Sequence, residues 1–244
     1  MKKKLSLALV VAVLLTGLFA ACTMPSGGTA SGAPAFKTPE AAIEHFVAAI
    51  AANNYAKAMQ ASAYGPLAEG YNFEAMANRL KMVMPANNMA PNDGGFYTEL
   101  NRTMEAGNFS RQMQMFCYSF LSDENLMMAL PMEKPSDAQA FAGTIDAKKL
   151  VGLKLLAIAL PGEMIETAMA RQNLAAQATV YGASERTERV TLYELGGETF
   201  LGGFSLLRYG GNWYIHTLTS NFAGTPALGT VTPITTTEFQ SAYG

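Results

Sequence analysis

The sequence is poor in the side chains that most often carry out chemistry. Its 244 residues include two cysteines, Cys22 and Cys117, and two histidines, His45 and His216. A zinc site needs about four such ligands, or three and a water molecule, and these residues stand at no recognisable spacing. We therefore expect no metal site and no cofactor.

Strong positive charge is also lacking. The net charge is −2, and after Lys2–Lys4 no run of Lys and Arg suggests a polybasic lipid patch. A mildly acidic, mixed composition argues against nucleic acid as a partner. A second long apolar run free of charges is missing as well, so we expect no membrane span beyond the N-terminal segment.

The N-terminus has the layout of an export signal. Lys2–Lys4 precede Leu5–Ala21, an apolar run of 17 residues interrupted only by Ser6, Thr16 and Gly17. A positive start followed by such a run is typical of a secretory signal, and the run is shorter than the ~20 residues of a usual spanning helix. An uncleaved anchor and an ordinary signal cut after Ala21 are the alternatives.

The end of this run, Leu18-Phe19-Ala20-Ala21-Cys22, resembles the lipobox of bacterial lipoproteins. The resemblance implies that residues 1–21 are a signal peptide and that Cys22 carries a diacylglycerol thioether, usually with a palmitate-like acyl chain on its new amino group. Two or more chains anchor a protein stably, so we expect it on the extracytoplasmic side of the cell membrane. Thr23, rather than Asp, follows the cysteine, which in a host with two membranes resembles lipoproteins sorted to the outer one.

The processed chain must rest on its hydrophobic core. With Cys22 acylated, Cys117 is the one remaining thiol, so an internal disulfide is excluded. Loss of the leader leaves 14 Lys and Arg against 19 Asp and Glu, a net charge of 14 − 19 = −5. Residues 22–37 are rich in Gly, Ser and Pro, which predicts a flexible tether, and residues 38–244 are long enough for a sizeable core.

The folded part is expected to open with helices. Thr38-Pro39-Glu40 is a helix start, and an apolar stripe follows at helical spacing, formed by Ile43, Phe46, Val47 and Ile50. Asn53-Asn54 breaks it. A second short helix is predicted from Tyr55 to near Gly65-Pro66, and a third after Asn72.

Residues 85–148 match no pattern that we can assign and are treated as an insertion. Pro85 to Gly95 is rich in turn residues and is predicted as a loop. Phe96 to Ala106 is moderately helical, whereas the apolar run Met113 to Leu121 fits helix or strand. Beyond the insertion, Leu150 to Leu160 favours a buried strand and Glu163 to Gln177 a helix.

The C-terminal part predicts an antiparallel meander of three strands. Val190 to Leu195, Thr199 to Tyr209 and Trp213 to Thr219 are joined by glycine-rich turns, which are strong hairpin signals. Gly202-Gly203 inside the long strand suggests a bulge. The tail from Asn221 onward fits an edge strand or an irregular wrap.

The opening helix with Thr38-Pro39-Glu40, the closing strand Gly211-Asn212-Trp213-Tyr214-Ile215 and the exported tether together resemble the NTF2-like lipoproteins of bacteria. The resemblance implies an α+β fold in which N-terminal helices pack on the concave face of a curved antiparallel sheet and leave a conical pocket. That family includes enzymes and binding modules, so the fold alone does not define a function.

Candidate site residues lie in the predicted sheet. Tyr214, His216 and Phe204 are the side chains that we expect to line a pocket, with His216 a candidate general base if the pocket is catalytic. A packed or surface histidine is the simpler interpretation, and we expect His45 to face water. Ser205 lies outside the Gly-x-Ser-x-Gly pattern of a hydrolase elbow, and Trp213 is expected in the core.

The methionines admit two interpretations. Met82, Met84, Met113 and Met115, with Met127, Met128 and Met132, could bind copper(I) through soft thioethers. They are also what fills irregular cores and adaptable interfaces, which we prefer.

Two functions from different classes follow. The first is a non-enzymatic, membrane-anchored module that binds a small apolar ligand or an envelope protein partner. The second is an NTF2-like pocket enzyme that uses His216 or a carboxylate such as Glu198 as general base. Self-assembly within a larger envelope complex is a third reading of the same features.

Overall fold

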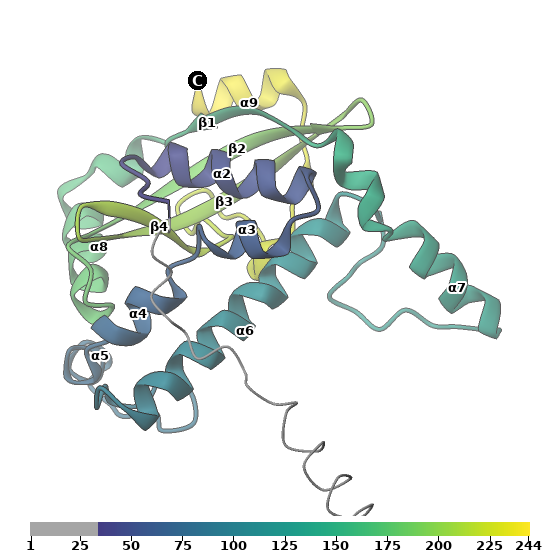
Figure 1. Ribbon diagram of the computed structural model, residues 1–244. Helices are drawn as coiled ribbons and strands as arrows, with labels where there is room; N and C mark the ends of the chain where they lie inside the picture. The colour runs from purple at the N-terminus through teal and green to yellow at the C-terminus, as the bar shows by residue number, and fades with distance from the viewer. Residues whose placement is uncertain (1–33) are drawn as a thin grey trace, which may run out of the picture. The chain divides into compact units, whose positions relative to one another are not determined.

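An antiparallel β-sheet is the centre of residues 34–244, the part of the chain that the computed structural model describes (Figure 1). The predicted leader 1–21, Cys22 and most of the predicted linker lie outside the described residues. Four strands lie in the order β1-β2-β3-β4. The short strand β5 pairs with Phe200 and Leu201 of β3, along the part of the β3 edge that β4 leaves uncovered. They are β1 (Lys154–Ala159), β2 (Glu185–Leu195), β3 (Glu198–Tyr209), β4 (Asn212–Thr217) and β5 (Thr232–Pro233). The α+β class is confirmed.

The predicted meander is confirmed in β2, β3 and β4. Gly196-Gly197 joins β2 to β3, and Gly210-Gly211 joins β3 to β4. All four glycines have positive φ, between 55° and 91°. Two-residue turns of this kind match the right-handed twist of the strands and need residues that adopt positive φ, which explains why glycine fills both turns.

The bulge predicted at Gly202-Gly203 is wrong. The pairing of β2 with β3 is continuous from Glu185 to Leu195, and the register shifts lie in β1 and between β3 and β4. The two glycines instead permit close packing. A Cβ on Gly202 would lie 2.8 Å from the Tyr193 ring, and one on Gly203 would lie 2.5 Å from the backbone nitrogen of Ser220.

Helix α2 (Pro39–Ala51) begins where the sequence predicts. The Thr38 hydroxyl accepts a hydrogen bond from the Ala41 N–H at 3.1 Å, and the predicted apolar stripe is buried. The ordered structure starts earlier than the predicted boundary, however. Phe36 is buried, and its carbonyl accepts a hydrogen bond from the Trp213 N–H at 2.8 Å, so the end of the predicted linker belongs to the domain.

The short helices after α2 differ in part from the prediction. The predicted second helix is two helices, α3 (Tyr55–Met59) and α4 (Tyr64–Gly70). Pro66 lies in the first turn of α4, where proline is tolerated because its missing N–H needs no partner. Helix α5 (Phe73–Leu80) begins after Asn72 as predicted, with the Asn72 side chain accepting a hydrogen bond from the Ala75 N–H.

The insertion contains the longest helix of the described residues. Helix α6 (Phe96–Ser119) includes most of the run from Met113 to Leu121, so the choice between helix and strand is settled as helix. A loop then leads to α7 (Pro135–Thr144), which starts where the sequence breaks at Pro135. Residues 147–152 form a 3-10 helix, so the predicted strand starts only at Lys154.

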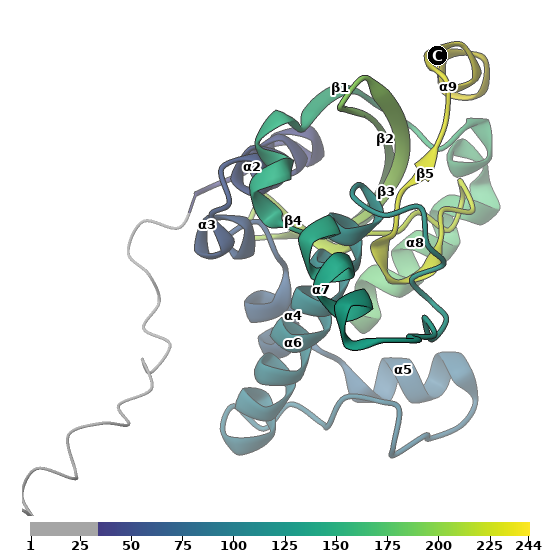
Figure 2. The ribbon, with the colours of Figure 1, turned by 90° about the vertical axis from the view of Figure 1, so that its right-hand side faces the viewer.

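Helices α2 and α6 pack on one face of the sheet, and β2 curves around them (Figure 2). Phe46 of α2 is in edge-on contact with Phe109 and Phe116 of α6 and with Phe204 of β3, at ring-centroid distances of 5.8, 5.6 and 6.0 Å. Trp213 is buried in the same core, as predicted.

The other face of the sheet is covered by later elements. The predicted helix from Glu163 to Gln177 is a 3-10 helix (Glu163–Glu166) followed by α8 (Ala168–Val180). The tail contains a short 3-10 turn, the edge strand β5 and α9 (Thr236–Tyr243), whose Phe239 packs on Val190 and Leu192. Within residues 34–244, no helix is both long and apolar enough to span a membrane.

Candidate functional site

A large hollow lies between α7 and the segment that leads to it from α6. Its volume is about 750 Å³, within the range of pockets that hold small molecules. We call it the α7 groove. It is lined by Leu121, Ser122, Asp123, Glu124, Leu130, Pro131, Met132, Asp137, Ala138, Ala140, Phe141 and Thr144.

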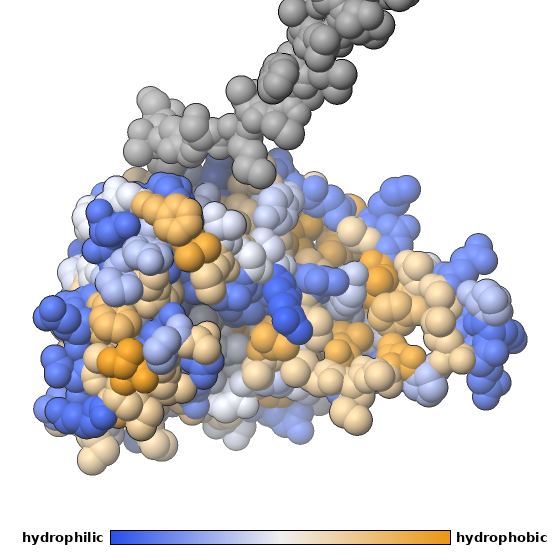
Figure 3. Space-filling model, turned by 90° about the horizontal axis from the view of Figure 1, so that it is seen from below, coloured by the Kyte–Doolittle hydropathy of each residue, from blue (hydrophilic) through white to orange (hydrophobic). Residues whose placement is uncertain are grey.

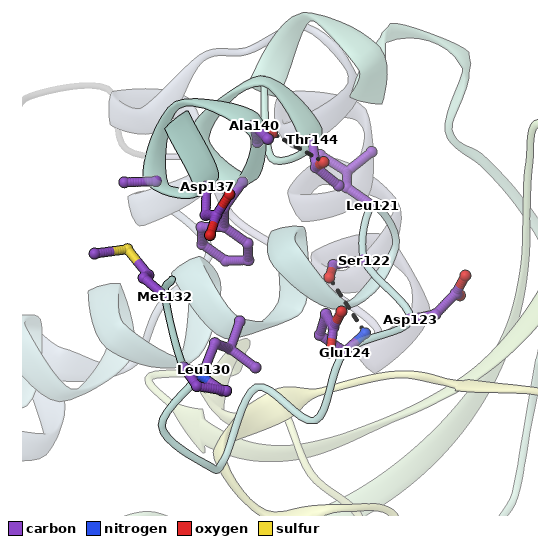
Figure 4. Close-up of a pocket in the computed structure, with 12 residues that line it drawn as sticks. Leu121, Ser122, Asp123, Glu124, Leu130, Met132, Asp137, Ala140 and Thr144 are labelled. Atoms are coloured by element: carbon purple, nitrogen blue, oxygen red, sulfur yellow. Dashed lines mark hydrogen bonds between the residues drawn. The ribbon is translucent and has the colours of Figure 1, made fainter. Parts of the chain in front are cut away.

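Apolar side chains from two elements form the walls of the α7 groove (Figure 4). Ala140 and Phe141 come from α7. Leu130 and Met132 come from the loop opposite (Figure 4). The Phe141 ring contacts Tyr118 of α6 edge-on, with centroids 6.3 Å apart. This contact connects α7 to the rest of the domain while Phe141 still lines the groove.

Hydrogen bonds fix the polar edge of the α7 groove. Asp137 Oδ2 accepts hydrogen bonds from the N–H groups of Glu133 and Lys134, at 3.0 and 3.1 Å, which fixes the first turn of α7. Ser122 Oγ accepts one from the Glu124 N–H at 3.3 Å. In Figure 4 the Asp137 carboxylate faces the groove, whereas that of Asp123 points away from it.

Exposed methionines surround this region. Met127, Met128 and Met132 are 55%, 67% and 61% exposed. Met127 also lines a neighbouring hollow of about 300 Å³ between the loop, the start of β3 and residues 230–233. Seen from below, apolar residues gather on the side that carries α7, and hydrophilic residues lie at its outer end (Figure 3). Exposed methionines are flexible and polarizable, which suits an adaptable binding surface.

The sequence could not locate this site. Its residues come from the segment 85–148, which we left unassigned, and the turn-rich loop has no periodicity that would indicate what it encloses. The signals that were present were the cluster of methionines and the start of a helix at Pro135.

The predicted pocket residues do not come together. Phe204 lies in the core between the sheet and α2, fully buried. Tyr214 and His216 lie on the opposite face of the sheet, because Tyr214 pairs with Leu207 and successive residues alternate between faces. Placing Phe204 in one pocket with Tyr214 and His216 is therefore wrong.

His216 is partly buried and packs against an aromatic ring instead of lining a described hollow. Its ring lies 4.5 Å from that of Tyr181, measured between centroids, and its Nδ1 is buried without a hydrogen-bond partner. Burial, together with the nearby Arg186 guanidinium, lowers the pKa of His216 to about 3. A hollow between α5 and the end of α8 is lined by Tyr181 and not by His216.

A buried polar network that the sequence analysis missed lies on the same face of the sheet. Glu188 is 1% exposed, and its carboxylate accepts hydrogen bonds from the Ser220 hydroxyl at 2.8 Å and the Phe222 N–H at 3.1 Å. Arg186 lies 3.5 Å from it and donates to Ser205 at 3.1 Å. These contacts hold the loop after β4 on the sheet, which is a structural role.

Two further residues of chemically reactive types, His45 and Cys117, are explained by packing within the fold. His45, predicted to face water, is half-buried, with Nε2 3.0 Å from the carbonyl oxygen of Lys57 and its ring 4.9 Å from that of Phe36. Cys117 lines an apolar hollow of about 200 Å³ between α2, α6 and residues 145–150. Burial raises the pKa of its thiol to about 12. In residues 34–244, no three His, Cys, Asp or Glu side chains gather as metal ligands would.

The comparisons with known proteins yield one structural similarity. No family model matches the chain, and no curated protein does. A solved structure of a cystatin-like protein from Ruminococcus gnavus ATCC 29149 is similar over 80% of this chain and 44% of that chain, with 17% sequence identity and a TM-score of 0.47. The chain thus spans less than half the length of that protein.

Proposed function

We propose that this protein is an exported, lipid-anchored binding module that holds a small apolar ligand in the α7 groove without transforming it. The observation that carries the proposal is the groove itself: a hollow of about 750 Å³ with Leu130, Met132 and Phe141 in its walls. Apolar walls with a few polar groups at the edge are the usual composition of small-molecule sites. The leader and the lipobox-like residues ending at Cys22 support an anchor on the extracytoplasmic side of the cell membrane, the outer membrane where the host has one.

We assign the domain to the NTF2-like cone folds. The position of α2 and α6 on the curved face of the antiparallel sheet supports this assignment. The place where that family has its conical pocket is filled here by aromatic side chains, among them Phe46, Phe116 and Tyr193. A ligand therefore has more room in the α7 groove, outside the sheet.

The geometry does not favour the enzymatic alternative. A general base works best when its pKa lies near the operating pH, whereas that of His216 is lowered to about 3. Its ring also packs against Tyr181 and not along a described hollow. Binding without catalysis is the simpler function for this arrangement.

The test uses N-phenyl-1-naphthylamine, a neutral probe whose fluorescence rises in apolar surroundings. The protein is the chain from residue 23 onward, since residues 34–244 form one compact unit. Trp in place of Ala140, which lines the groove, is expected to fill it and weaken binding at least tenfold. Ala142→Trp is the matched control, because Ala142 is exposed on the same helix but does not line the groove. Equal affinities in both variants would exclude the α7 groove as the site.

The anchor is tested separately. Cells that produce the full chain are fractionated, and the protein is expected in the membrane fraction with acyl mass on Cys22. Cys22→Ser should move it to the soluble extracytoplasmic fraction or leave it unprocessed. An unlipidated wild-type protein would refute the anchor and leave the groove proposal untouched. If the groove is empty in protein taken from native membranes, a small ligand is excluded and the binding partner is an envelope protein.

A further inference from the structure

The α7 groove has a charge pattern that restricts its ligand. Residues 121–144 contain four acidic side chains, Asp123, Glu124, Glu133 and Asp137, and one basic side chain, Lys134, a net charge of −3. Asp123, Glu124 and Asp137 belong to the groove lining, although the carboxylate of Asp123 points away from the hollow (Figure 4). An anionic ligand placed there would meet like charge, which is unfavourable at short range.

The carboxylates that line the groove have unused capacity to accept hydrogen bonds. The ion pairs found within residues 34–244 do not include Asp123, Glu124 or Asp137. Both hydrogen bonds that residues 34–244 donate to Asp137 end on Oδ2, which leaves Oδ1 able to accept from a ligand, and the Asp137 carboxylate faces the groove (Figure 4). The Ser122 hydroxyl accepts from a backbone N–H and keeps a lone pair for a further donor.

We propose that the ligand of the α7 groove is a cationic amphiphile: an apolar chain or ring system with an amine or quaternary ammonium group at one end. This inference rests on the proposed function and adds the ligand class to it. The apolar body lies against Leu130, Met132 and Phe141, and the cation lies at the edge near Asp137 and Glu124. The carboxylates attract an amine through charge-assisted hydrogen bonds and a quaternary ammonium through its charge alone, so the head group decides the affinity between ligands with equal tails.

Two sources could supply a ligand of this chemistry, a membrane lipid and a free small molecule. An amine-bearing lipid and a free cationic amphiphile would meet the same walls and the same carboxylates. Native mass spectrometry of protein taken gently from its own membranes distinguishes them, since a lipid keeps two acyl chains of diagnostic mass.

The test compares three probes with the same twelve-carbon tail: dodecyltrimethylammonium, dodecyl maltoside and dodecyl sulfate. Each displaces N-phenyl-1-naphthylamine from the chain from residue 23 onward, below the concentration at which it forms micelles. We expect dodecyltrimethylammonium to bind about tenfold more tightly than dodecyl maltoside, because the carboxylates attract its positive charge, and dodecyl sulfate to bind most weakly. The difference should shrink at high salt, because exposed charges are screened.

Two variants show whether the preference for the cationic probe comes from the groove or from the overall charge of the protein. Glu124→Gln should remove most of the preference for the cation, because Glu124 lines the groove. Glu133→Gln removes the same charge from a neighbouring residue that does not line it and should keep the preference. Equal effects in the two variants would overturn the inference.

The outcomes for the inference and for the proposed function differ. Three probes of equal affinity, all weakened by Ala140→Trp, would keep the groove as a binding site and overturn the choice of ligand class. Failure of all three, and of the neutral probe, would overturn both. A preference for dodecyl sulfate would also refute the inference.

Discussion

Replacing Gly203 by Ala tests the packing on which the domain depends. A Cβ at this position would lie 2.5 Å from both the Ser220 nitrogen and the Thr225 hydroxyl oxygen. The nearest atom belongs to the backbone, so the loop after β4 must move. That movement disturbs the 2.8 Å hydrogen bond from the Ser220 hydroxyl to Glu188, a carboxylate that is 1% exposed.

The size of the effect follows from two contributions. Overpacking costs about 1–3 kcal/mol, and a lost hydrogen bond to a buried charge costs about 1.5–3 kcal/mol. We therefore expect Gly203→Ala to lower the free energy of unfolding by about 2.5–6 kcal/mol. With a urea m value of about 3 kcal/mol/M, the midpoint of unfolding falls by about 0.8–2 M.

The matched control is the same substitution at Gly107. This glycine lies within α6, and a Cβ there would meet no atom within 4 Å. Alanine is the better helix former, so Gly107→Ala should raise the stability by about 0.5–1 kcal/mol. Urea unfolding followed by circular dichroism measures both variants. Equal midpoints for the two variants would refute the account of Gly203.

Three further predictions concern titration, reactivity and stability. The His216 imidazole should stay neutral from pH 8 to pH 5 in an NMR titration, because burial lowers its pKa to about 3; a transition near pH 6.5 would contradict that burial. The unfolded state takes up this proton below about pH 6.5, whereas the folded state takes it up only near pH 3. The free energy of unfolding therefore falls as the pH drops from about 6.5 to about 3, and His216→Gln should make that fall less steep. Cys117, with a thiol pKa raised to about 12, should react with 5,5′-dithiobis(2-nitrobenzoate) at least a hundredfold more slowly in the native protein than in urea; equal rates would show that the thiol is accessible. Glu188→Ala should lower the free energy of unfolding in urea by about 3–5 kcal/mol, because it leaves Arg186 as a buried, unpaired charge. The control is Glu166→Ala: Glu166 is exposed and pairs with Arg171 at 2.6 Å, so its loss should lower the free energy of unfolding by less than about 1 kcal/mol.

The elements set by local signals were predictable from the sequence. The cap at Thr38, the stripe of α2 and the glycine turns of the meander depend on residues close to one another in the chain. Each signal has a local physical cause, either an orphan N–H at a helix start or a positive φ. These predictions are therefore confirmed almost residue by residue.

Features set by distant residues were not predictable. Gly203 was interpreted as a bulge because its real neighbour, Ser220, comes from a loop 17 positions later. Phe204 was placed in a pocket because alternation along a strand identifies two faces but does not say which of them meets helix α2. The α7 groove depends on the path of the loop between α6 and α7, for which no periodicity exists.

The measurement that tests the central claim most directly is NMR of the protein labelled with ¹³C in its methionine methyl groups. Met132 lines the α7 groove, whereas Met164 and Met169, 69% and 82% exposed, lie near and in α8 and do not line it. On titration with dodecyltrimethylammonium, we expect the Met132 signal to shift and saturate while those of Met164 and Met169 stay in place. An unmoved Met132, or equal shifts of all three, would contradict a binding site in the α7 groove.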